Sequence, residues 1–220
     1  MITVDILDNN FLSKNNTIND LNSDKQRRIG ILGGSFDPVH LGHIRIARIS
    51  LEKISLDRVF FVPAAIPPHK QHVELSDQRH RLKMLQLALA NEPAFCVSDV
   101  ELRRQGVSYT IDTIYYFKKK YHLPPERLFL IIGADNLVHF HQWKAPQKIL
   151  QNCQLLVYRR PEVDLSMVDD HLKNQLQFID APLIDISASD IREKIASGQD
   201  ISQLAPPEII PYIFRHHLYH

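Results

Sequence analysis

The sequence predicts an α/β domain built on a doubly wound, Rossmann-like parallel sheet. Short apolar runs alternate along the chain with amphipathic segments of helical period, and this alternation is typical of βαβ units. Several runs are apolar throughout, as expected for strands that are covered on both faces. A glycine pair, Gly33-Gly34, directly follows the first of these runs. Together these observations favour a sheet whose ligands bind beyond the carboxyl ends of its strands.

Apolar runs and helical periodicity place the elements in order along the chain. The predicted strands are Arg28–Leu32, Arg58–Val62, Phe95–Val97, Leu128–Ile132, Leu155–Tyr158 and Leu183–Ile186. The predicted helices are Leu41–Lys53, Asp77–Ala90, Thr110–Tyr121, Leu165–Asn174, Ser189–Ala196 and Glu208–His216. Residues 28–220 are therefore expected to form one domain. Residues 1–27, rich in Asn, Asp, Ser and Lys, are expected to form a polar extension with little order.

The amino-acid composition indicates which binding partners and which cellular compartment to expect. The 220-residue chain is 44% hydrophobic and 23% charged, which suits a globular domain with a sizeable core. Its formal net charge of +1 gives no overall field toward nucleic acid or a membrane surface. Cys96 and Cys153 are too few and too far apart for a zinc motif or a disulfide framework. Neither a signal peptide nor a membrane span is apparent, so we expect a cytoplasmic protein.

The turn after the first predicted strand has the features of a phosphate-binding site. Glycines at 33 and 34 allow close backbone approach and φ > 0, and the following helix offers free N–H groups at its positive end. His40 and His43 lie three residues apart where that helix is expected to begin, at Leu41. The turn matches neither G-x-x-x-x-G-K-[ST] nor G-x-G-x-x-G. A tight turn with two partly exposed histidines is the plainer interpretation, but the strand-turn-helix context favours phosphate binding.

Two signatures of one superfamily occur at opposite ends of the domain. Residues 33–43 read GGSFDPVHLGH, which resembles the signature of the H-x-G-H nucleotidyltransferases, and residues 186–192 read ISASDIR, which resembles the second signature I-S-x-[ST]-x-I-R. Between them lie PPHK (67–70), SYTIDT (108–113), GAD (133–135), Trp143 and RRP (159–161). In this order the motifs resemble the bacterial nicotinate-mononucleotide adenylyltransferases, from about Arg28 to the C-terminus. The resemblance implies a single nucleotidyltransferase domain.

The resemblance implies transfer of the adenylyl group of ATP to nicotinate mononucleotide, giving nicotinate adenine dinucleotide and pyrophosphate in NAD biosynthesis. The attacking phosphate is already an anion, so positioning and charge neutralisation are the expected catalytic means. Mg²⁺ is expected to arrive as Mg-ATP, since no carboxylate cluster in the sequence indicates a dedicated metal site. ATP and the mononucleotide are the expected partners, and a homo-oligomer is left open.

The ATP-binding residues implied by the resemblance are Gly33, Gly34, Ser35, Phe36, His40, His43, Lys70, Gly133, Asp135, Ile186, Ser189 and Arg192. His43 is expected to stabilise charge at the α-phosphate, and His40 to orient the triphosphate. Ser189 and Arg192 are expected to clamp the β- and γ-phosphates.

Simpler roles remain open for several residues of this set. Residues 187–190 also have the form of a capping box, and Lys70 can be a solvated lysine on a proline-rich loop. Asp135 is expected either to bind a ribose or to cap the helix that follows. The role of Asp37, in a turn before proline, is left open.

Three residues are implied for the mononucleotide. Thr110 matches a position whose backbone meets the pyridine carboxylate, and Trp143, the one tryptophan, matches an aromatic residue that stacks on the pyridine ring. Arg159 follows a strand and is expected either to bind an anion or to cover the surface. A lone tryptophan is more often part of the core, so both interpretations of Trp143 are kept.

Other functions are weighed against this one. Pantetheine-phosphate adenylyltransferase shares the H-x-G-H motif and the clamp, but the SYTIDT segment and Trp143 argue against it. Another acceptor, such as nicotinamide mononucleotide, stays open because acid-versus-amide choice depends on loop geometry. A class I aminoacyl-tRNA synthetase would require a longer, more basic chain. A non-catalytic nucleotide sensor would not need both histidines and Arg192.

Overall fold

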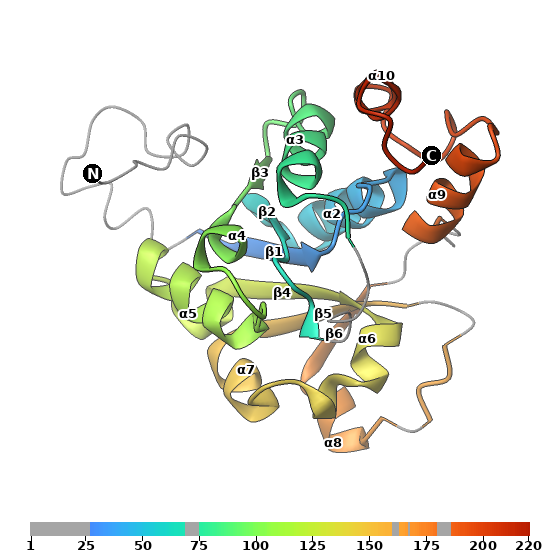
Figure 1. The fold of residues 1–220 in the computed structure, drawn as a ribbon. Coiled ribbons are helices and arrows are strands. Elements are labelled where there is room, and N and C mark those ends of the chain that lie inside the picture. Colours follow the sequence, from blue (N-terminus) through green and yellow to red (C-terminus); the bar gives the residue numbers. More distant parts are fainter. Residues whose placement is uncertain (1–26, 69–74, 160–162, 167, 180–185) are drawn as a thin grey trace, which may run out of the picture.

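A six-stranded, entirely parallel sheet forms the centre of the protein (Figure 1). The computed structural model describes residues 27–68, 75–159, 163–166, 168–179 and 186–220. Its strands are β1 (Ile29–Gly34), β2 (Arg58–Pro63), β3 (Phe95–Val97), β4 (Leu128–Gly133), β5 (Gln154–Tyr158) and β6 (Leu176–Ile179). They are ordered β3-β2-β1-β4-β5-β6. The predicted doubly wound α/β fold is thus confirmed.

Helices cover both faces of this sheet. One layer contains α2 (Leu41–Ile54), α3 (Gln78–Ala88), α9 (Ala188–Ala196) and α10 (Ile210–Arg215). The other contains α4 (Val100–Arg104), α5 (Thr110–Tyr121), α6 (Ala134–Val138), α7 (Pro146–Asn152) and α8 (Asp170–Lys173), with the 3-10 turns η2 (Pro125–Arg127) and η3 (Phe140–Gln142). Figure 1 shows α3, α9 and α10 on one side of the strands and α5, α7 and α8 on the other.

Alternation along the strands creates two hydrophobic cores. In β4, Leu128, Leu130 and Ile132 face the α5 and α7 layer, whereas Phe129 and Ile131 face the α2 and α9 layer. Successive side chains of a strand point to opposite faces, so a strand buried on both sides must be apolar at every position. This explains why the central strands could be recognised as continuous apolar runs.

The strand order reverses between β1 and β4, which are adjacent and parallel. The chain moves outward from β1 through β2 to β3, then returns across the sheet to β4 and moves outward the other way. The loops after β1 and β4 therefore diverge toward opposite faces, and a ligand crevice lies at this point in doubly wound sheets. The glycine-rich turn after β1 and residues 133–135 after β4 both lie here.

The last predicted strand was wrong in position. Residues 183–185 lie outside the described residues, and Ile186 is not in a strand. The sixth strand is instead β6, which pairs with β5 at the edge of the sheet. Its sequence Leu-Gln-Phe-Ile has an exposed Gln177 between partly buried Leu176 and Phe178. Such an edge strand lacks the continuous apolar signal of the central ones.

The helix predicted over Leu165–Asn174 was also wrong, because only Asp170–Lys173 is helical as α8. Asp164 accepts hydrogen bonds from the backbone N–H and hydroxyl of Ser166, at 2.8 Å each, and this forms a local turn. Asp169 then accepts from the Leu172 N–H at 3.2 Å and delays the start of the helix. Side chains of Asp and Ser compete with helical backbone bonding in this way. The short helices α4, α6 and α7 were not predicted.

The other predicted helices are found with small shifts at their ends. Asp77 caps α3 by accepting the Arg79 N–H at 2.8 Å, so this helix begins one residue later than predicted. The predicted N-terminal extension lies outside the described residues except for Arg27. Within the described part of the chain, no helix has the length and apolar character needed to cross a membrane.

Two glycines of β1 provide a matched test of packing in the sheet. A Cβ at Gly30 would lie 2.9 Å from Leu56 Cδ1 and 3.1 Å from Ile131 Cδ1, whereas a Cβ at Gly33 would meet nothing within 4 Å. We expect Gly30→Ala to lower the free energy of unfolding by about 1–2 kcal/mol through overpacking. Gly33→Ala should leave it unchanged or raise it slightly. Urea denaturation of both variants measures the difference, and equal effects would contradict this packing.

Candidate active site

The two histidines of the H-x-G-H motif form one unit at the start of α2. His40 is the N-cap, and Leu41 opens the helix as predicted. The His40 N–H donates to His43 Nδ1 at 3.2 Å, and the rings stack with centroids 3.6 Å apart. Because Nδ1 of His43 accepts this bond, its neutral ring carries the proton on Nε2. His43 can therefore donate a hydrogen bond from Nε2.

Phe36, not a glycine, adopts the left-handed backbone conformation of this turn. Its φ is 49°, whereas Gly33 and Gly34 are the last residues of β1 and have no positive φ, so the predicted use of φ > 0 at the glycine pair was wrong. The buried Phe36 ring lies 4.9 Å from the His43 ring and 5.7 Å from the Phe61 ring. A Cβ at Gly34 would come within 3.1 Å of it. Gly34 thus makes room for Phe36, which supports His43.

Asp37 is the point where four segments of the chain meet, and the sequence left its role open. Its carboxylate is 3% exposed. One carboxylate oxygen accepts the Ser76 N–H at 3.0 Å, and the other accepts the Tyr219 hydroxyl at 2.6 Å. Its backbone carbonyl accepts from Arg192 Nη1 at 2.8 Å. Asp37 therefore fixes the turn through both its side chain and its main chain.

The buried side chain of Arg81 also binds this turn, through backbone carbonyls. This α3 residue is 2% exposed, and its Nη1 donates to the carbonyls of Ser35 and Ala64 at 2.8 Å each. Its Nε donates to the Ser76 carbonyl at 3.0 Å. Burial lowers the pKa of the guanidinium, and the charge of Asp37 opposes that lowering. A buried arginine that stays charged thus ties the loops after β1 and β2 together.

The second motif lies beside the first. Ser187 caps α9 by accepting the Asp190 N–H at 3.1 Å, so the capping role suggested for residues 187–190 is confirmed. Ser189 has a different partner, because its hydroxyl accepts from Arg192 Nη2 at 3.2 Å. The same guanidinium reaches the Asp37 carbonyl. Residues 150 positions apart in sequence therefore form one polar cluster at the start of α2 and α9.

A cavity of about 530 Å³ adjoins the first turn of α2. Leu41, Gly42 and Ile186 line it, together with charged residues that include Arg48 and Glu92. Ile186 packs at the periphery of the core that contains α9. Apolar walls next to a cluster of phosphate-type donors suit a planar ring attached to a phosphate chain.

The residues predicted for the mononucleotide belong to the opposite layer. Thr110 is the first residue of α5, after the N-cap Tyr109. Lys144 Nζ lies 4.2 Å from the centroid of the Tyr109 ring and 3.3 Å from Asp112 Oδ2. Since Lys144 follows Trp143, these contacts bring the Trp143 segment to the start of α5. Trp143 itself is half-buried, with its ring 5.4 Å from that of Phe140.

A buried carboxylate supports the start of α5, and the sequence gave no indication of it. Glu101 is 7% exposed and accepts from the Thr113 hydroxyl, which also accepts from Arg104 at 3.2 Å. Burial raises the pKa of Glu101, and the bonds from Thr113 and Ser108 oppose the rise. Ser108 Oγ accepts the Ala65 N–H at 2.9 Å. The segment that includes Thr110 is therefore tied to the loop after β2.

The remaining predicted residues have varied surroundings. Gly133 is the N-cap of α6, so the capping role considered for Asp135 was wrong. Asp135 is exposed on the first turn of α6, close to Gly133, where a Cβ would lie 2.2 Å from Asp135 Oδ1. The Arg159 guanidinium lies 4.6 Å from the centroid of the Phe178 ring. Lys70 lies outside the described residues.

No group of three or more His, Cys, Asp or Glu side chains is placed to hold a metal ion among the residues that the structure describes. The carboxylate of Asp37 is bonded to the Ser76 N–H and the Tyr219 hydroxyl, and the other polar side chains at the turn include the nitrogen donors and hydroxyl of His40, His43, Ser189 and Arg192. Such donors suit phosphate oxygens, whereas Mg²⁺ prefers carboxylates and water.

Sequence reasoning missed Arg81, Tyr219 and Glu101. An arginine in an amphipathic helix is ordinarily assigned to the solvent face, and the spacing of Arg81 beside apolar Met84 and Leu85 was the available signal. Tyr219 is the penultimate residue of the chain, where order is seldom expected. Nothing in the local sequence indicates that Glu101 is buried.

Comparison with known protein families shows which broad family the chain belongs to. A sequence model described as "Cytidylyltransferase-like" matches residues 31–194, about three quarters of the chain and both signatures. The chain therefore belongs to the cytidylyltransferase-like family. The match begins in β1 and ends in α9, so it contains every segment that bonds to Asp37 except the C-terminal residue Tyr219.

Curated relatives define the particular group. A probable nicotinate-nucleotide adenylyltransferase of Clostridium tetani is 37% identical over 88% of this chain and 99% of its own length. One of Rhodopirellula baltica is 40% identical over 87% of this chain and 92% of its own. The chain belongs to the nicotinate-nucleotide adenylyltransferase family.

The fold also matches a solved structure, the nicotinic acid mononucleotide adenylyltransferase of Plasmodium falciparum complexed with NaAD. The TM-score is 0.69 at 21% identity, over 88% of this chain and 98% of that one. A putative nicotinate-nucleotide adenylyltransferase of Vibrio parahaemolyticus gives a TM-score of 0.64 at 19% identity, over 88% of this chain and 96% of that one. At these identities the likeness establishes the fold alone.

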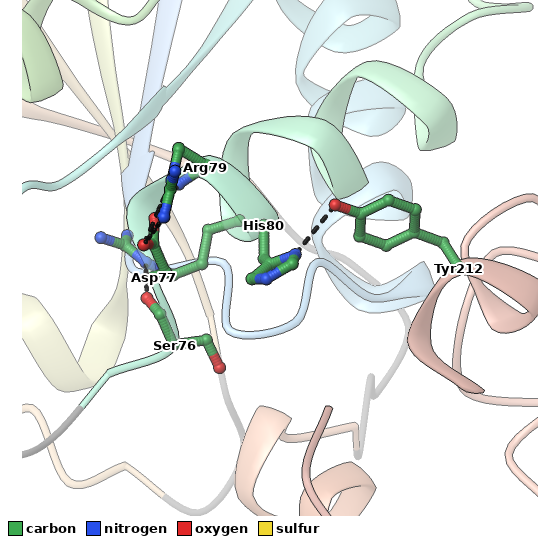
Figure 2. A network of polar contacts seen from close by, with 6 residues as sticks. Ser76, Asp77, Arg79, His80 and Tyr212 are labelled. Atoms are coloured by element: carbon green, nitrogen blue, oxygen red, sulfur yellow. Dashed lines mark hydrogen bonds and ion pairs between the residues drawn. The ribbon is translucent and has the colours of Figure 1, made fainter. Parts of the chain in front are cut away.

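Arg81 and Arg79 on α3 offer a matched test of the buried guanidinium. Arg81→Met leaves three carbonyls without their donor and Asp37 without its counter-charge, so we expect the free energy of unfolding to fall by about 3–5 kcal/mol. Arg79 pairs with Asp77 on the surface, as Figure 2 shows, and Arg79→Met should have little effect because exposed ion pairs contribute little. Chemical denaturation measures both. Equal losses would show that Arg81 does not hold the turn.

Proposed function

We propose that this protein transfers the adenylyl group of ATP to nicotinate mononucleotide, and that the convergence of its two signatures forms the triphosphate site. The observation that carries the proposal is the Arg192 guanidinium, which joins Ser189 to the Asp37 carbonyl beside His40 and His43. A planar guanidinium, two imidazoles and two helix N-termini are thus gathered at one turn. This is the donor set that a polyphosphate requires.

The reaction requires the protein to position the two substrates and to neutralise their negative charge. An oxygen of the mononucleotide 5′-phosphate attacks the α-phosphorus of ATP, and the bond from this phosphorus to the bridging oxygen breaks. Pyrophosphate leaves with that oxygen. Because the nucleophile is already ionised, no side chain has to remove a proton. Two polyanions must nevertheless be brought together, so preorganised cationic groups and N–H donors supply the catalysis.

On the ATP side, His43 donates from Nε2 to the α-phosphate while negative charge develops there, and His40 orients the triphosphate. Backbone N–H groups of Ser35 and Phe36 bind phosphate oxygens above the open face of Gly33. Arg192, with Ser189, holds the β- and γ-phosphates that depart as pyrophosphate. Mg²⁺ enters with ATP as part of the substrate and neutralises charge on the phosphate oxygens.

The bases occupy two separate regions. The cavity lined by Gly42 and Ile186, with Arg48 and Glu92 also at its walls, is the region that we assign to the adenine ring. The pyridine ring of the mononucleotide stacks on Trp143, and its carboxylate meets the N-terminus of α5 at Thr110, where helix polarity favours an anion. Arg159 assists the mononucleotide phosphate. This arrangement favours nicotinate over nicotinamide, since the amide carries no charge to meet the helix.

The role of His43 can be separated from its structural bond. His43→Asn keeps an acceptor for the His40 N–H near the position of Nδ1 but has no donor in place of Nε2. His43→Ala lacks both. We expect both variants to lower kcat at least ~10²-fold, as when one preorganised donor is lost from an active site. Pyrophosphate release measures kcat, with circular dichroism as a check on folding. A folded His43→Asn variant with normal kcat would contradict the role of Nε2.

The lone tryptophan reports on acceptor binding. If Trp143 stacks on the pyridine ring, nicotinate mononucleotide should quench its fluorescence saturably, ATP alone should quench it much less, and nicotinamide mononucleotide should require higher concentrations. Trp143→Ala should raise KM for the mononucleotide, with KM for ATP nearly unchanged, since a lost base stack costs on the order of 1–3 kcal/mol. Unchanged fluorescence, together with a lowered Tm in Trp143→Ala, would assign Trp143 to the core.

A further inference from the structure

The C-terminal end of the chain returns to the turn that carries the H-x-G-H motif. The Tyr219 hydroxyl donates to Asp37 Oδ1 at 2.6 Å, across 182 residues of sequence. His217 and Tyr219 have left-handed backbones, with φ of 50° and 68°. His217 lies just past α10, where the Leu218 N–H donates to the Ile213 carbonyl at 3.1 Å and ends the helix. Figure 1 shows this end of the chain beside α9 and α10.

The contact is suited to hold the turn in place. Burial and the charge of Asp37 raise the pKa of Tyr219 well above its usual range, so the hydroxyl stays protonated and donates at every pH in ordinary use. Ser76 holds the other carboxylate oxygen at 3.0 Å. With both oxygens fixed, the peptide plane of Asp37 has little freedom to rotate. Its carbonyl therefore stays directed at Arg192 Nη1, 2.8 Å away.

We propose that Tyr219 is a positioning residue for the triphosphate site, acting through Asp37 on the Arg192 guanidinium. Arg192 has one Nη on the Asp37 carbonyl and the other on Ser189, so its plane is set by these two acceptors. When the Tyr219 hydroxyl is absent, Asp37 loses one of its two anchors and the guanidinium loses a fixed acceptor. The inference rests on the proposed function in one respect, that Arg192 binds the phosphates of ATP.

Tyr212 provides a matched control in the same part of the chain. Its hydroxyl bonds to His80 Nδ1 at 2.9 Å, which joins α10 to α3 (Figure 2). Both tyrosines are partly buried and both lie in the C-terminal 10 residues of the chain. Within the described part of the chain, Tyr212 makes no hydrogen bond to Asp37 or Arg192, so its hydroxyl should support folding without affecting the phosphates.

The experiment compares Tyr219→Phe, Tyr212→Phe and Arg192→Lys with the wild-type protein. Calorimetry gives the Kd of a non-hydrolysable ATP analogue, steady-state assays give kcat and both KM values, and thermal unfolding gives Tm. We expect Tyr219→Phe to weaken analogue binding by about tenfold, the effect of one hydrogen bond to a charged group. KM for nicotinate mononucleotide should stay unchanged. Tyr212→Phe should lower Tm and leave the Kd at its wild-type value.

A double-mutant cycle tests whether Arg192 carries the effect. In the Arg192→Lys background the planar fork is already lost, so adding Tyr219→Phe should weaken analogue binding by less than twofold. Additive effects on Kd would show that Tyr219 does not act through Arg192. Equal effects of the two Tyr→Phe variants on Kd, or none from Tyr219→Phe, would overturn the proposal.

The proposal stays testable if Tyr219→Phe fails to fold or if the protein does not use nicotinate mononucleotide. If Tyr219→Phe does not fold, Asp37→Asn, which keeps an acceptor oxygen but removes the charge, should show the same loss of analogue binding with an unchanged KM for the mononucleotide. Unaltered binding in Asp37→Asn would then overturn the proposal. If wild-type protein binds the analogue but does not use nicotinate mononucleotide, the acceptor assignment fails, and the Kd comparison still decides the role of Tyr219.

Discussion

The attachment of the β1–α2 turn to a buried arginine and a buried aspartate is the constraint on which the site depends. Arg81 binds the carbonyls of Ser35, Ala64 and Ser76, while Asp37 binds Ser76, Tyr219 and Arg192. A phosphate-binding turn must present unpaired N–H groups to its ligand, so it cannot be stabilised by pairing those groups internally. The contacts of Arg81 and Asp37 hold this turn through its carbonyls and one carboxylate, so these contacts do not use its N–H groups.

This constraint also explains why the histidine pair is preorganised. The Phe36 ring, placed by a left-handed backbone, and the stacked His40 ring both contact the His43 ring. A donor whose tautomer and orientation are fixed before the substrate arrives loses little entropy in the transition state. A reaction between two polyanions benefits most from such fixed donors. Mobile charged side chains would stabilise the ground state as strongly as the transition state, and would therefore not lower the barrier.

The sequence was sufficient for the central strands, the long helices and the two signatures, because each has a strong local pattern. Continuous apolar runs identified β1, β2 and β4, which are buried on both faces. The edge strand β6 was missed because half of its surface faces solvent, and the helix over Leu165–Asn174 was overpredicted because side chains of Asp164 and Asp169 end the helical pattern locally. The roles of Arg81 and Tyr219 could not be predicted, since they arise only from contacts between distant segments.

The candidate site residues lie on elements that pack on opposite faces of the sheet, each face with its own hydrophobic core. His40, His43, Ile186 and Arg192 are carried by α2, α9 and the segment before α9, which pack on one face of the sheet. Thr110 and Trp143 are carried by α5 and the end of η3, which pack on the other. The strand order reverses at β1 and β4, so ligands held by the two layers can meet only at the carboxyl ends of these strands. Because each layer has its own core, the side that we propose for the mononucleotide can be altered without loosening the side that we propose for the phosphates. A doubly wound fold can thereby change its acceptor while keeping adenylyl transfer.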